Sequence, residues 1–221
     1  MGGIWGMNAW GLIKAGGPIM APLLLCSLFA LAIVIEKFIF FASLKTDVLK
    51  LKREIFACIK DNKIKEAVEL CGKNRSPVAK ILKAGIVRFG APREEIKESI
   101  EDTSLYEIPR LEGRLNALAT IAHISPLLGL LGTVTGMTSN FYTIQMRANS
   151  LNPVTAGDLA GGIYEALLTT VAGLFVAIPT YVAYNYFVHR LNHIILEMER
   201  AATELINFMC HMTETRIPEK I

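Results

Sequence analysis

Hydrophobic residues are concentrated in three long runs of this 221-residue chain, at residues 15–35, 115–146 and 166–189, and none of the runs contains Asp, Glu, Lys or Arg. A helix crosses a hydrocarbon core of about 30 Å with about 20 residues, so each run is long enough to span a membrane. We therefore predict an all-α integral membrane protein with three transmembrane helices and a helical cytoplasmic domain. The pattern excludes an ordinary soluble enzyme, a secreted disulfide scaffold and a disordered chain.

Positive charge is concentrated between the first two runs, because residues 45–114 hold most of the 23 Lys and Arg residues. Lys and Arg favour the cytoplasmic side of a membrane, so this loop is predicted to be cytoplasmic and the N-terminus to lie outside. The predicted segments are an outer N-terminus at 1–14, transmembrane helices at 15–42, 115–145 and 159–189, a cytoplasmic helical loop at 43–114, an outer loop at 146–158, and a cytoplasmic C-terminal helix at 190–221.

A secretory signal peptide is the rival interpretation of residues 1–35. A signal peptide has a basic start and an apolar core of about 7–15 residues. Here the start is rich in Gly and Trp with a single Lys, and the apolar run is longer, so an uncleaved span is favoured. The net charge of +3 is too small to indicate a nucleic-acid partner.

The cytoplasmic loop is predicted to be helical throughout. Ser76-Pro77 and Pro92 are typical helix starts, and Pro109 is expected to kink the last helix of the loop. After Arg190 an apolar stripe indicates one more helix, packed either on the loop helices or on another subunit. The four cysteines form no metal-site or C-x-x-C pattern, and no disulfide, metal or cofactor is expected.

The second span carries small and polar residues on one face. Gly129, Thr133, Gly136 and Asn140 recur at steps of four, three and four, and Gly132 with Gly136 forms a G-x-x-x-G pair. Such spacing lets helix backbones approach closely, so helix packing is the favoured interpretation of the glycines.

The third span holds one ionisable side chain at its start, Glu165, with Thr169 one turn further on. A carboxylate in a membrane usually faces a bundle interior or a wet cavity, so these residues could line a narrow path. The alternative is a glutamate at the outer interface, in water, and the spacing does not decide between the two. Apart from Glu165, the spans offer no carboxylate near mid-membrane, so a proton-driven machine would need an acid from another polypeptide.

Both spans resemble the ExbB/TolQ/MotA proton-channel family. The similar stretches are residues 124–136, ISPLLGLLGTVTG, and residues 162–174, GIYEALLTTVAGL, followed by Ala177-Ile178-Pro179 and Tyr184-Asn185. Three spans resemble ExbB and TolQ more than the four of MotA. At Thr135, ExbB and TolQ typically carry Trp, and at Thr169 they often carry Ala, so the subgroup and the ion stay open.

The resemblance implies a bacterial inner-membrane motor that uses the proton motive force for work across the envelope, and no enzyme activity. It implies a homo-pentamer around a small single-span partner of the ExbD/TolR type whose Asp carries the proton, with a TonB- or TolA-like transducer beyond. It places Thr133, Glu165 and Thr170 in the ion pathway. The helix-packing positions are Gly129, Gly132, Gly136, Gly173, Pro126 and Pro179.

A membrane scaffold is the alternative function. In such a protein the spans only pack, and the cytoplasmic helices recruit other proteins. The threonines and the glutamate separate the two hypotheses, since a scaffold needs neither. No P-loop of the form G-x-x-x-x-G-K-[ST] occurs, so ATP is not an evident energy source.

Overall fold

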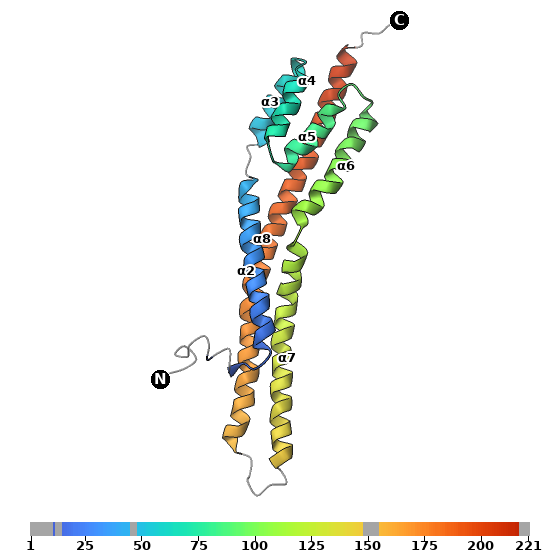
Figure 1. Ribbon diagram of the computed structural model, residues 1–221. Coiled ribbons are helices and arrows are strands. Elements are labelled where there is room, and N and C mark those ends of the chain that lie inside the picture. The colour runs from blue at the N-terminus through green and yellow to red at the C-terminus, as the bar shows by residue number, and fades with distance from the viewer. Residues whose placement is uncertain (1–10, 12–14, 45–47, 148–154, 217–221) are drawn as a thin grey trace. The chain divides into compact units, whose positions relative to one another are not determined.

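A computed structural model describes residues 11, 15–44, 48–147 and 155–216, and the longer elements in these ranges are all α-helices (Figure 1). The predicted all-α class is therefore confirmed. The helices are α2 (Met20–Ser43), α3 (Val48–Lys60), α4 (Ile64–Lys73), α5 (Pro77–Val87), α6 (Arg93–Glu112), α7 (Leu115–Arg147) and α8 (Ala156–Arg216). Most of the predicted N-terminal segment 1–14 and of the predicted loop 146–158 lies outside the described residues.

Three helical stretches are long and apolar enough to cross a membrane: Met20–Ser43, Arg93–Arg147 and Leu159–Met212. Within the most apolar part of each, only 17%, 28% and 28% of the residues are buried by the rest of the chain. A single copy thus leaves most of the surface of its spans uncovered, as expected when lipid and other protein chains cover it.

The chain divides into two compact units. The span unit combines the residues up to Glu36 with Arg114–Tyr186, and the loop unit combines Lys37–Gly113 with the residues from Phe187 onward. In the span unit, α7 and the first part of α8 lie side by side (Figure 1). The long helix α8 contributes residues to both units.

The loop unit has an apolar core built from α3, α4, α5, α6 and the last part of α8. The predicted start at Ser76-Pro77 is confirmed, because the Ser76 hydroxyl accepts a hydrogen bond from the Ala79 amide at 3.2 Å and Pro77 is the first helical residue. The apolar stripe after Arg190 packs on the loop helices, where Leu205 and Ile100 converge on Gly85. The core side chains of the stripe are Leu191, Ile194, Met198, Ala202, Leu205, Ile206 and Met209.

The boundary between α6 and α7 lies a few residues after Pro109. Helix α6 runs through Pro109 and ends at Glu112, and the chain breaks its helical path at Gly113 and Arg114. Arg114 adopts a positive φ of 67°, which right-handed helix geometry does not allow. The interruption is therefore a two-residue break after the proline, and the following helix α7 begins at Leu115.

Candidate functional site

The small residues of α7 share one buried face. Gly129, Gly132, Gly136 and Asn140 are all buried, whereas large apolar residues on the other faces of the same stretch of α7 are exposed. The exposed set comprises Leu127, Leu130, Leu131, Val134, Met137 and Phe141. The helix thus presents a narrow groove of small side chains to the protein and an apolar surface to the outside.

The groove of α7 receives the backbone of α8. A Cβ atom added to Gly129 would lie 3.0 Å from the Thr169 carbonyl oxygen, and one added to Gly136 would lie 2.8 Å from the Gly162 carbonyl oxygen. On the opposite side, a Cβ at Gly173 would lie 2.6 Å from the Ser125 carbonyl oxygen. The two helices therefore run antiparallel, at a separation that a side chain at Gly136 or Gly173 would not fit and that leaves little room at Gly129.

Two threonines of α8 lie at this contact. Thr169 is fully buried, its side chain rests on Gly132, and its hydroxyl donates to the Ala166 carbonyl at 2.8 Å. Thr170 is half-buried, and its hydroxyl lies 3.2 Å from both the Gly129 carbonyl of α7 and the Ala166 carbonyl of its own helix. Thr170 thus links the two helices by a polar contact between its hydroxyl and the backbone of α7.

Thr133 is half-exposed, next to the buried Gly132 on α7. Its hydroxyl donates to the Leu130 carbonyl of its own helix at 2.6 Å. A threonine hydroxyl that donates in this way keeps its oxygen lone pairs as acceptors. Thr133 and Thr170 can therefore each accept a hydrogen bond from water while their protons stay bound to the helices.

Glu165 lies against the segment that precedes α2. Its side chain is half-buried, and its carboxylate contacts the backbone at Gly17. Gly17 has a positive φ of 66°, and a Cβ atom added there would collide with the Glu165 carboxylate. The structure thus brings a glutamate of α8 and a glycine turn at the start of the first span together.

The two prolines of the spans have different surroundings. Pro126 is half-buried in α7, and Pro179 is exposed in α8. Pro179 lines a cavity of about 230 Å³ between α2 and α8, together with Ala30, Val34, Val176 and Thr180. A proline in a helix removes one backbone donor, which leaves a carbonyl one turn earlier without its usual partner.

The sequence placed Asn140 on the small, polar face of the second span and Thr169 on the face of Glu165, but it gave no sign of Gly17. Asn140 is buried, donates from its amide nitrogen to the Leu159 carbonyl at 3.2 Å, and rests on Gly162. The four-residue step from Gly136 to Asn140 was a signal for its position on the packed face. No sequence signal connects Gly17 with Glu165, because they belong to different spans.

The comparison with protein families gives a match over more than half of the chain. The profile of the MotA/TolQ/ExbB proton channel family matches residues 73–200, a region that includes α5, α6, α7 and much of α8. All three residues of the predicted ion pathway lie in the matched region.

Individual proteins of similar sequence carry names from the same family. The biopolymer transport protein ExbB-like 3 of Synechocystis is 34% identical over 174 residues, which cover 78% of this chain and 81% of that protein. An ExbB homologue of Methanothermobacter thermautotrophicus is 33% identical over 61% of this chain and 46% of its own length. The Tol-Pal system protein TolQ of Haemophilus influenzae is 41% identical over 47% of this chain and 45% of its own length. The matches to these last two proteins span less than half of their length.

Proposed function

This chain belongs to the MotA/TolQ/ExbB proton channel family, and from this membership we propose that it is the ion-conducting subunit of an inner-membrane motor. The motor uses the proton motive force to do work across the cell envelope, such as energising outer-membrane transport or maintaining the envelope. The names of the relatives, biopolymer transport and Tol-Pal system proteins, support a role of this kind.

The observation that carries the proposal is the polar content of the α7–α8 contact. Thr170 bridges the two helices through its hydroxyl, and Thr133 presents a hydroxyl oxygen on a half-exposed position of α7. Helices that only anchor a protein need no such groups, because lipid-facing packing is satisfied by apolar side chains. Hydroxyl groups that can accept from water suit a path for protons between subunits or along a partner helix.

The proposed pathway lacks an acid that loads and releases a proton within the membrane. Glu165 is the one ionisable residue at the start of its apolar run, and it lies against Gly17. We therefore assign the proton-carrying carboxylate to a small single-span partner of the ExbD/TolR type. Five copies of this chain surround that partner in the proposed assembly, and a TonB- or TolA-like transducer receives the work.

The proposed topology follows the charge distribution. The loop with most of the Lys and Arg residues lies in the cytoplasm, the N-terminus and the 146–158 loop face the periplasm, and three helices cross the membrane. The large uncovered surface of the spans in a single copy supports an assembly of several chains, since neighbouring copies would cover part of it.

The test is partner-dependent ion flux in liposomes, measured with a pH-sensitive dye at several sodium concentrations. Thr133→Val and Thr170→Val remove a hydroxyl and nearly keep the shape of the side chain, so flux should fall while the oligomer still assembles. Ser at either position keeps the hydroxyl and should retain more flux than Val. Glu165→Gln keeps the size of the side chain, removes the charge, and should also lower the flux.

Thr138→Val is a matched control, because Thr138 is an exposed threonine of the same helix whose hydroxyl also donates to its own helix, to Val134 at 2.7 Å. This variant should conduct like the parent. If Thr133→Val and Thr170→Val both conduct like the parent as well, the threonines serve packing only and the assignment of the pathway is wrong. If Glu165→Gln fails because the oligomer is lost, the role of Glu165 is structural.

A further inference from the structure

A second polar site lies in the loop unit, away from the α7–α8 contact. A partly open cavity of about 400 Å³ lies between the end of α2, the start of α5 and the end of α6. Its walls include the apolar side chains of Phe40 and Leu111 and four charged ones, Arg75, Lys80, Glu107 and Arg110. The site is thus part apolar and part charged.

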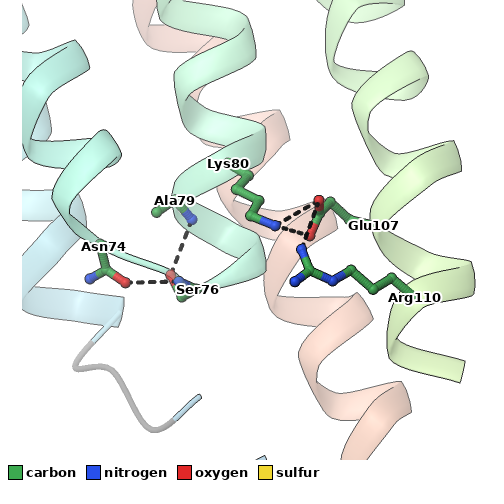
Figure 2. A network of polar contacts seen from close by, with 6 residues as sticks. All are labelled: Asn74, Ser76, Ala79, Lys80, Glu107 and Arg110. Carbon is green, nitrogen blue, oxygen red and sulfur yellow. Dashed lines mark hydrogen bonds and ion pairs between the residues drawn. The ribbon is translucent and has the colours of Figure 1, made fainter. Parts of the chain in front are cut away.

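The charges in this cavity do not balance. Lys80 donates to both carboxylate oxygens of Glu107, at 2.8 and 2.7 Å, so this carboxylate is already neutralised by one cation. Arg110 approaches the same carboxylate only to 4.0 Å, and its side chain is 64% exposed. Figure 2 shows Lys80 and Arg110 converging on Glu107 from α5 and α6.

Arg75 forms no ion pair with another described residue, and it is exposed at the edge of the cavity. Three cations therefore share one carboxylate, which leaves an excess of two positive charges. Pro77, the first residue of α5, also lines the cavity, so the positive end of that helix dipole adds to the excess. An anion with one or two negative charges would balance the site.

The cavity lies at the level of a membrane surface, because its wall includes the last turn of the first span. Helix α2 has 24 residues and is therefore about 36 Å long, against about 30 Å for the hydrocarbon core of a bilayer. The side chains of Phe38 and Ile39, just before Phe40, are exposed and apolar, as in a segment that faces lipid. The end of α2 thus reaches the headgroup region.

A buried lysine fixes two walls of the cavity to each other. The Lys37 ammonium donates to the Leu111 carbonyl at 2.9 Å and lies 5.2 Å from the centre of the Phe40 ring. It therefore joins the last turns of α2 to the end of α6. The cavity is built by a specific contact between these two helix ends.

We propose that this cavity binds the phosphodiester headgroup of an anionic phospholipid. Arg75 and Arg110 hold the phosphate, because guanidinium groups match phosphate oxygens bidentately. The acyl chains lie along the exposed apolar side of α2 at Phe38 and Ile39. A basic pocket beside a membrane helix is well suited to such a headgroup, and the apolar wall of Phe40 and Leu111 favours a lipid over a free phosphate ion.

The test is lipid binding to the purified full chain in mild detergent, measured by native mass spectrometry. Dioleoyl phosphatidylglycerol is titrated as the anionic lipid and dioleoyl phosphatidylcholine as the zwitterionic one. Each cation near an anionic headgroup changes the affinity by about fivefold, so Arg75→Gln with Arg110→Gln should weaken phosphatidylglycerol binding by about 25-fold. Glu107→Gln removes the competing carboxylate and should strengthen it by about fivefold.

Arg88→Gln is the matched control, because Arg88 is exposed, lies just after α5 and does not line the cavity. It makes the same charge change and should leave the affinity for phosphatidylglycerol unchanged. Far-UV circular dichroism checks that every variant is folded. Both variants remove charge from the same network, so a purely structural effect should change phosphatidylglycerol binding in the same direction in each. Opposite changes in binding therefore indicate a direct role of these side chains in binding.

Three results would overturn the proposal. The first is unchanged phosphatidylglycerol binding in the double arginine variant. The second is equal binding of phosphatidylcholine by the parent chain. The third is displacement of phosphatidylglycerol by inorganic phosphate at equal concentration, which would make the cavity a site for a free anion. None of these measurements uses ion flux, so this inference and the proposed conduction can fail independently.

Discussion

Replacing Gly173 by alanine tests the closeness of the α7–α8 contact most directly. The added Cβ would lie 2.6 Å from the Ser125 carbonyl oxygen and 3.1 Å from the Gly129 Cα atom, which are both backbone atoms of α7. Non-bonded carbon atoms pack best at about 3.5–4.0 Å, so the helices would have to separate by roughly an ångström at this point. Overpacking of this kind costs about 1–3 kcal/mol.

The control for this substitution is Gly161→Ala in the same helix, where an added Cβ meets no atom within 4 Å. Both variants gain about 1 kcal/mol of helix propensity, so the difference between them isolates the steric cost. The assay is unfolding in dodecyl maltoside with increasing mole fractions of dodecyl sulfate, followed by circular dichroism. Gly173→Ala should be less stable than Gly161→Ala by about 1–3 kcal/mol. Equal stability of the two variants would refute the close contact.

Three further substitutions test other parts of the structure by the same unfolding assay. Gly17→Ala should destabilise the chain by about 1–2 kcal/mol, because alanine disfavours the φ of 66°, whereas the Glu165 side chain can turn away from the added Cβ; unchanged stability would contradict the left-handed backbone at residue 17. Ser76→Ala removes the cap of α5 and should cost about 0.5–2 kcal/mol, whereas Ser43→Ala, at an exposed helix end, should cost less. Burial raises the pKa of the Cys71 thiol from 9.0 to about 11, although the nearby Lys83 acts in the opposite direction. As the pH rises, the thiol therefore loses its proton first in the unfolded chain, and the free energy of unfolding should fall between pH 9 and pH 11. Cys71→Ala should lose this pH dependence, and a parent chain equally stable at both pH values would show that the thiol is not buried.

Local sequence signals were sufficient for much of the fold. Three apolar runs without charges predicted the candidate spans, because a bilayer sets both the length and the composition of the helices that cross it. Ser76-Pro77 predicted the start of α5, since a hydroxyl cap and a proline act on the first turn alone. The spacing of Gly129, Gly132 and Gly136 indicated one packed face of α7, which the structure places against α8.

Contacts between distant segments could not be predicted in this way. Lys37 lies two residues beyond an apolar run and gives no sign that it bonds to the Leu111 carbonyl, 74 residues away. The backbone geometry of the break before α7 was not predicted either. Proline is the usual cause of a kink, but α6 tolerates Pro109, and the positive φ of Arg114 depends on its surroundings. Arg114 forms an ion pair with Glu36 of α2, a partner that no local pattern identifies.

The contact between Gly17 and Glu165 bears on which residues can replace the glycine during evolution. Residue 17 meets two separate demands, a left-handed backbone and the space that the glutamate occupies. A shorter side chain at position 165 lifts only the second demand, after which asparagine, which tolerates a left-handed backbone, becomes acceptable at position 17. β-Branched residues stay excluded because the backbone demand remains. The backbone demand is the stricter one, because the Glu165 carboxylate ends a flexible side chain that can turn away, whereas the φ of 66° stays with the turn. Asparagine is therefore tolerated best at position 17 in a lineage where residue 165 is already shorter.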